Sequence, residues 1–176
     1  MRLFKYILIF GLVIFGFAYV HAGKARNFQY KTPTNFTQEI NYFPAFFPSI
    51  YSYTGSDKIT VMIPPEIKTT GLDLPKTKTG TLVPEFLEGK RNFNTTFGIE
   101  NWEMSSYRFT TTSFGERLEI LGSYTSLAGI KTEFMEHHYF GKNVTRSIHL
   151  FYPTKSDGKI VEQAKLSLQT FNPNIN

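Results

Sequence analysis

The side chains most able to do chemistry in this sequence gather in one stretch near its C-terminal end. Glu136, His137 and His138 are consecutive, and Arg146 and His149 follow soon after. A carboxylate beside imidazoles can bind a metal ion or carry a proton. Two histidines without a third ligand make a poor zinc site, since catalytic zinc takes three protein ligands and structural zinc four. The sequence therefore assigns no catalytic, cofactor or metal residue and predicts no cofactor. A weak metal or proton-switch site at His137 and His149 is the alternative.

A β-hairpin is expected to position these side chains, because Gly141-Lys-Asn143 lies between two runs of strand-forming residues. A three-residue loop would place Glu136 and His138 on the core-side face, with His138 opposite Arg146. The other two histidines would then lie diagonally on the opposite face. We interpret Glu136 and Arg146 as an ion pair that fixes the register. A shift of one residue would undo this arrangement.

Four consecutive strands are expected, because β-branched, aromatic and polar residues alternate between turn residues. They cover residues 103–112, 117–124, 131–140 and 144–152. In the last of them Val144, Ile148, Leu150 and Tyr152 share one face, which predicts a core on that side. Gly122 indicates a bulge or the close approach of another segment.

A helix follows these strands. Thr154-Lys-Ser-Asp157 supplies N-cap oxygens, and Asn172-Pro173 ends the helix. Between them the apolar residues recur at helical spacing: Ile160, Val161, Ala164, Leu168 and Phe171. The predicted fold class is α+β, an antiparallel sheet packed through one apolar layer against a C-terminal helix. The sheet comprises the meander of four strands at 103–152 plus N-terminal strands.

The first 22 residues resemble a secretory signal peptide. Met1–Lys5 is basic, Tyr6–Ala18 is apolar, and Val20-His-Ala22 has small residues at the cleavage positions. We expect cleavage near Ala22, which leaves residues 23–176 as one α+β domain. The alternative is an uncleaved anchor, because the apolar run approaches the roughly 20 residues that span a bilayer.

The composition limits the cellular locations and the classes of partner that fit this protein. No cysteine is present, so disulfides, thiolate metal sites and a lipoprotein anchor are excluded. Removal of Arg2 and Lys5 with the signal peptide would lower the formal charge from +5 to +3, which is only weakly basic. The lysines and arginines are scattered rather than clustered, so nucleic acid is a poor partner. A periplasmic or secreted location is expected, with membrane contact only through an uncleaved signal segment. Three sequons, at Asn35, Asn94 and Asn143, would be glycan acceptors in a eukaryotic secretory route.

The segment 23–56 is dense in aromatic residues and is broken by prolines. An edge strand at 28–30 and a hairpin of 50–53 with 58–63 are expected there. The aromatic rings either form a surface for a peptide, lipid or sugar, or fill the second face of the sheet. Candidate partner-binding residues in this segment are Phe43, Phe46, Phe47 and Tyr51.

A polar connection near 64–81 follows, and it carries Lys68, Lys76 and Lys78. Long irregular connections are often functional, so these lysines are further candidates for partner binding. The alternative is a solvated flexible connection. A short helix is expected at 82–90, with Pro84 in its first turn.

The C-terminal part resembles the Mog1/PsbP-like superfamily, which includes small exported bacterial proteins of the DcrB type. The likeness covers roughly residues 100–172. It lies in the succession of Leu121-Gly-Ser-Tyr124, Gly129-Ile-Lys-Thr-Glu-Phe134, His149-Leu-Phe-Tyr-Pro153 and a helix ending in Leu166-Ser-Leu-Gln-Thr-Phe171. The resemblance implies an α+β sandwich that acts as an accessory, assembly or chaperone-like factor. It brings no catalytic residues with it.

Two functions are therefore compared. The first is an exported, non-enzymatic binding protein for a protein or peptide in the cell envelope, chaperone-like or an immunity protein. The second is an enzyme or weak metal-binding protein with a site around His137 and His149. No nucleophile elbow, zinc-protease motif or phosphate-binding glycine loop occurs in the sequence, which favours the first.

Overall fold

The structure is a computed structural model that describes residues 28–39, 47–68, 74–96, 99–142 and 144–175. The expected signal peptide lies outside these residues, as do the candidates Phe43 and Phe46. Within the described ranges no helix is long and apolar enough to cross a bilayer.

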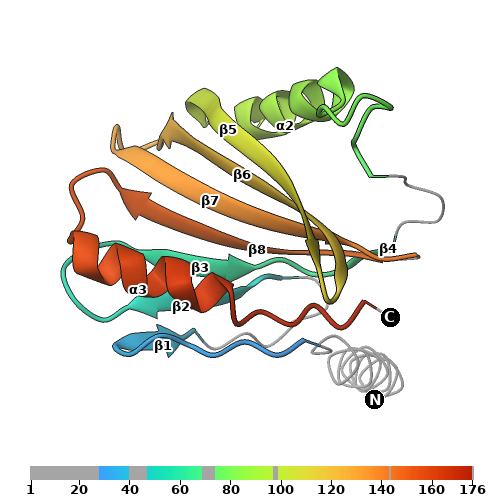
Figure 1. The fold of residues 1–176 in the computed structure, drawn as a ribbon. Helices are drawn as coiled ribbons and strands as arrows, with labels where there is room; N and C mark the ends of the chain where they lie inside the picture. The colour runs from blue at the N-terminus through green and yellow to red at the C-terminus, as the bar shows by residue number, and fades with distance from the viewer. Residues whose placement is uncertain (1–27, 40–46, 69–73, 97–98, 143, 176) are drawn as a thin grey trace, which may run out of the picture.

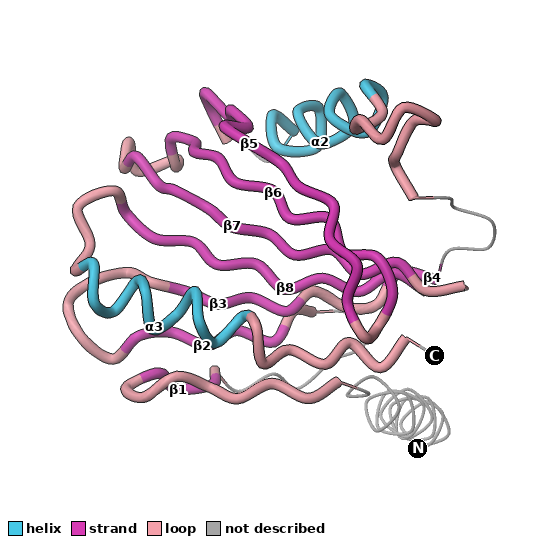
Figure 2. The backbone as a smooth tube through the Cα atoms, viewed as in Figure 1, coloured by secondary structure: helices cyan, strands magenta, loops and turns pink. Residues whose placement is uncertain are grey.

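One antiparallel sheet of eight strands connects most of the described chain (Figure 1). Its strands are β1 (Phe36–Gln38), β2 (Ser49–Tyr53), β3 (Thr60–Ile63), β4 (Ile67–Lys68), β5 (Glu100–Thr112), β6 (Gly115–Thr125), β7 (Lys131–Phe140) and β8 (Val144–Pro153). The spatial order is β1-β2-β3-β8-β7-β6-β5, and β4 pairs with β8 beside β3. Among the described residues two helices accompany it, α2 (Pro84–Thr96) and α3 (Gly158–Leu168) (Figure 2).

The predicted α+β class and the meander at 103–152 are confirmed. Strand β7 has the predicted bounds, and the other three strands differ from their predicted bounds by at most three residues. The N-terminal hairpin is also present, as β2 and β3. The edge strand expected at 28–30 is wrong, because Gln29 makes only an isolated bridge with Asn172, just beyond α3.

The helix α3 begins as its sequence predicts. The Asp157 carboxylate accepts a hydrogen bond of 2.8 Å from the Lys159 amide, which satisfies one of the free donors of the first turn. Val161, Ala164 and Leu168 are buried on the side that faces the sheet. Fully burying side chains of this kind stabilises the fold by roughly 1.5–3 kcal/mol for each large one.

The expectation of one apolar layer is wrong, because the sheet separates two hydrophobic clusters. In the first cluster, apolar side chains of α3 pack against side chains of β2 and β3 and against alternate side chains of β7 and β8. Rings of the N-terminal segment, among them Phe28, Tyr30 and Phe36, join this first cluster. The second holds Leu82, Trp102, Leu118, Ile120 and Phe134, with Phe86 and Leu87 of α2 packed against it. Figure 1 shows the two helices at different sides of the strands.

Gly122 of β6 has the role that the sequence indicates. A Cβ atom there would collide with the Glu103 carbonyl and the Phe134 ring. The ladder between β5 and β6 shifts register at this point, between Met104 and Ser106. The missing side chain leaves room for Phe134, whose ring stacks on Trp102 with centroids 5.8 Å apart.

A buried carboxylate and two histidines as the candidate functional site

The register between β7 and β8 differs by one residue from the predicted one. The Gly141 amide donates to the Val144 carbonyl at 2.9 Å, so these two residues pair with each other. Glu136 therefore lies opposite His149, and His137 lies opposite Ile148. The predicted pairing failed because a two-residue loop, which suits the twist of antiparallel strands, replaces the expected three-residue loop.

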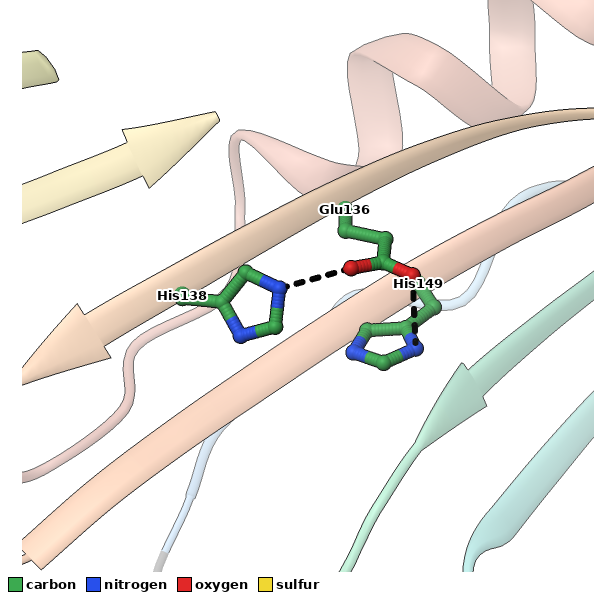
Figure 3. A group of neighbouring side chains, drawn as sticks. All are labelled: Glu136, His138 and His149. Atoms are coloured by element: carbon green, nitrogen blue, oxygen red, sulfur yellow. Dashed lines mark hydrogen bonds and ion pairs between the residues drawn. The ribbon is translucent and has the colours of Figure 1, made fainter. Parts of the chain in front are cut away.

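This register gathers Glu136, His138 and His149 on one face (Figure 3). The His138 Nε2 atom lies 2.7 Å from Glu136 Oε2, and the His149 Nδ1 atom lies 3.9 Å from Glu136 Oε1. The two imidazole centroids are 5.3 Å apart. One potential ligand atom from each residue lies within 4.8 Å of the others. The three residues are called the Glu-His-His cluster below.

The side chains of the cluster are almost fully buried. Their exposed fractions are 7% for Glu136 and 11% for each histidine. The Phe86 ring of α2 meets His138 edge-on, and the Phe151 ring of β8 does the same to His149. The Ser147 hydroxyl is hydrogen-bonded to His149 Nε2 at 3.0 Å, and this bond fixes the orientation of the imidazole ring. The cluster thus lies between the sheet and α2.

Lys90 of α2 is the cation that faces this cluster. Its ammonium group pairs with Glu136 Oε2, and its side chain is 19% exposed. The predicted ion pair between Glu136 and Arg146 is wrong, because Arg146 lies on the other face and pairs with Glu66. The helix was predicted to end at Lys90 and continues to Thr96, which keeps Lys90 within a regular turn.

Burial and the neighbouring charge set the protonation of the cluster. Burial lowers the pKa of His149 to about 3. Burial also lowers the pKa of His138, and the positive charge of Lys90 lowers it further. Burial opposes ionisation of Glu136. The nearby cationic and hydrogen-bonding groups, Lys90 and His138 among them, outweigh it and hold the pKa of Glu136 well below its usual value. At neutral pH the cluster is one carboxylate with two neutral imidazoles.

His137 lies on the opposite face of the sheet and belongs to a separate polar group. Its Nε2 atom lies 3.0 Å from Glu119 Oε2, without the alignment of a hydrogen bond. Arg108 also pairs with Glu119 at 2.7 Å, and Arg117 donates to the Gln169 side chain at 3.0 Å. The predicted pairing of His137 with His149 is therefore wrong, and His138 takes the place of His137.

The candidate partner-binding residues lie in different surroundings. Tyr51 is buried in the first cluster, where it meets Tyr30 edge-on. Phe47 is 58% exposed, and Lys68 and Lys78 are exposed. Lys76 pairs with Glu116 at 2.9 Å and lies over the Phe109 ring.

The comparison with known proteins identifies the fold. No protein-family model matches the sequence, and no curated protein matches it by sequence. Solved structures do match over most of their length. LpqN of Mycobacterium tuberculosis, involved in cell envelope biogenesis, superposes with a TM-score of 0.53 at 15% identity, covering 82% of each chain. The chain has the Mog1/PsbP-like fold.

Two further proteins share the Mog1/PsbP-like fold with this chain. The PsbP protein CyanoP of Synechocystis superposes with a TM-score of 0.56 at 8% identity, covering 84% of this chain and 86% of CyanoP. The Ran-binding protein Mog1p of Saccharomyces cerevisiae superposes with a TM-score of 0.53 at 12% identity, covering 86% of this chain and 92% of Mog1p. At such low identities the likeness concerns the fold.

Proposed function

We propose that this chain is an exported, non-enzymatic accessory protein that holds a protein or peptide partner in the cell envelope. The observation that carries the proposal is a set of exposed side chains, from separate stretches of the chain, that lie toward one end of the sheet. This surface, called the loop-end surface, comprises Phe47, Ile67, Lys68 and Lys78. It offers apolar groups beside positive charges, which suits a partner segment with carboxylates and apolar side chains.

Strand pairing places three members of the loop-end surface, Phe47, Ile67 and Lys68, toward the same end of the sheet. Phe47 stands two residues before Ser49, which pairs with Ile63 at the end of β3. Ile67 and Lys68 follow and pair with Thr145 and Val144 at the start of β8. Ile67 is 60% exposed, although it lies in a strand.

The 74–83 connection approaches the same end of the sheet. Lys76 pairs with Glu116 near the start of β6. A Cβ atom at Gly115, the first residue of β6, would lie 3.6 Å from the Phe140 carbonyl at the end of β7. Lys78 is two residues further along. Figure 1 shows β4 and this connection at one end of the strands. The exposed apolar side chain of Ile67 stands beside the Lys68 cation, an arrangement that a binding surface would use.

The fold neighbours support a role of this class. Mog1p is a Ran-binding protein, and LpqN is involved in cell envelope biogenesis. The Glu-His-His cluster is enclosed beneath α2, so a substrate would need that helix to move before reaching it. Chaperone-like and immunity roles are the two versions of this proposal.

Affinity capture with matched variants tests the proposal. The purified protein, immobilised and cross-linked in a cell-envelope extract, should recover one reproducible partner. The variant Ile67→Ser/Lys68→Glu should recover much less of it. Leu127→Ser is the matched control, because Leu127 is 83% exposed in the β6–β7 turn. Equal recovery by both variants, or no reproducible partner for the unchanged protein, would contradict the proposal.

A further inference from the structure

We propose that the Glu-His-His cluster is a binding site for a divalent transition metal of the zinc type, at which the Lys90 ammonium holds the place of the cation until a metal displaces it. This site is independent of the loop-end surface, because it lies within the space between the sheet and α2.

The geometry of the cluster is close to that of a metal site. The three ligand atoms lie within 4.8 Å of one another. Tetrahedral zinc with bonds of about 2.0–2.1 Å to nitrogen and oxygen needs ligand atoms about 3.4 Å apart. A movement of less than about 1 Å by each side chain closes the difference. The backbone requires no change, because Glu136 and His149 are paired residues of one ladder and His138 stands two residues from Glu136.

The chemistry of the ligands selects a class of metal. Two neutral imidazoles and one carboxylate suit zinc and its neighbours in the first transition row, whereas magnesium and calcium prefer oxygen ligands. The His149 Nε2 atom is already engaged by the Ser147 hydroxyl at 3.0 Å, which leaves Nδ1 directed toward Glu136. Such an outer partner is a regular feature of metal-binding histidines.

Lys90 supplies the second observation, because a cation already lies where a metal would bind. Its ammonium contacts Glu136, and its charge acts on His138 and His149 as well. A buried carboxylate needs such a partner when no metal is present. Three protein ligands leave a fourth position for water or another ligand, and in this structure the ammonium faces the cluster.

Displacement of Lys90 has a consequence for α2. None of the residues described in this helix is buried, and Phe86 and Leu87 contact the second cluster only in part. The attachment of α2 to the sheet therefore depends more on the Lys90–Glu136 ion pair than the attachment of a well-buried helix would depend on any single ion pair. Metal binding should weaken this attachment and release the Lys90 side chain to solvent.

Cobalt titration tests the site directly. The purified protein without a histidine tag is titrated with Co²⁺, and the visible absorption of four- or five-coordinate cobalt is recorded. We expect one ion per chain for the unchanged protein. Lys90→Met should bind at least about tenfold more tightly, because the competing ammonium is gone. His149→Ala and Glu136→Gln should lose the absorption, and Lys165→Met, a surface control, should not differ from the unchanged protein.

Several results would overturn the proposal. One is absence of cobalt absorption in both the unchanged protein and Lys90→Met while circular dichroism shows both folded. Undiminished binding by His149→Ala would place the ion elsewhere. Binding by Lys90→Met alone would mean that the ammonium is never displaced in the native chain. Equal affinities for the unchanged protein and Lys90→Met would remove Lys90 from the site.

Discussion

Glu136 is a carboxylate with a side chain only 7% exposed, and Lys90 is the residue of α2 that balances its charge. Removing one partner of a buried ion pair is costly because the other charge remains away from water. At an exposed pair the same change costs little, since water and salt already screen the charges. Lys165 and Glu162 on α3 form such an exposed pair, at 2.8 Å.

Lys90→Ala should therefore lower the free energy of unfolding by about 3 kcal/mol in the presence of a metal chelator. Lys165→Ala should lower it by less than about 1 kcal/mol. Urea unfolding followed by circular dichroism measures both. Equal small effects would mean that water reaches Glu136 and that Lys90 is not needed to balance it.

The stability of the protein should fall in mild acid. Burial lowers the pKa of His149 to about 3 from an unfolded value near 6.5, so the unfolded chain binds the proton first as the pH falls. The contribution of neutral His149 to the free energy of unfolding is complete above about pH 6.5 and is lost progressively between pH 6.5 and 3. His138, whose pKa is also lowered, adds to this loss of stability. Glu136 adds a further loss once the pH falls below the ordinary pKa of a glutamate, because the unfolded chain then takes up its proton before the folded chain does.

Urea midpoints measured across pH 7 to 4 check this expectation. The slope should approach about 1.4 kcal/mol per pH unit for each histidine that stays neutral in the fold. His149→Gln removes one titrating group and should flatten the curve. Flat stability down to pH 4 in the unchanged protein would show that the histidines are open to solvent.

At the scale of elements, the hairpin of β7 and β8 shows what the sequence could predict. Both strands and the core face of β8 followed from alternation and turn residues. Alternation assigns the two faces of each strand separately, but the pairing of one strand with the next depends on how many turn residues remain unpaired. Gly141 and Val144 pair with each other, and this detail moved His138 beside His149.

The contribution of α2 to the site could not be predicted in the same way. Lys90 stands at the predicted end of the helix, and 46 residues separate it from Glu136. No periodicity links two residues so far apart, because their contact depends on how α2 lies across the sheet. The helix itself was predicted at 82–90, with Pro84 in its first turn, and the structure places it at Pro84–Thr96.

Gly122→Ala should be among the most damaging small substitutions in the sheet. A methyl group there meets the Glu103 carbonyl and the Phe134 ring, so the cost should be about 1–3 kcal/mol of unfolding free energy. Gly89→Ala in α2 is the matched control. Apart from its chain neighbours and the backbone of its own helix, no atom lies within 4 Å of the added methyl. The change should therefore stabilise the helix by about 0.5–1 kcal/mol. Comparable effects at both positions would contradict the close approach at Gly122.

At the scale of the whole molecule, the proposal of export makes a direct prediction about the chain. Expression with the native N-terminus in a Gram-negative host should give a periplasmic protein whose first residue is Gly23. Periplasmic extraction and intact-mass measurement check it. Replacing Leu12 and Ile14 by arginine interrupts the apolar run and should retain the full-length chain inside the cell. A chain that keeps Met1 and stays with the membrane would favour the uncleaved anchor instead.

Because the sheet separates two hydrophobic clusters, strands β6 and β7 have no face that is free to vary. Residues 117–120 of β6 and 136–139 of β7 are buried without interruption, whereas β5 shows repeated exposed positions. A saturation mutagenesis screen scored by folded yield should find β6 and β7 intolerant at both odd and even positions, while β5 accepts changes at many of its sites. Adaptive change in this protein would then accumulate on its outer strands and connections and leave its middle almost fixed.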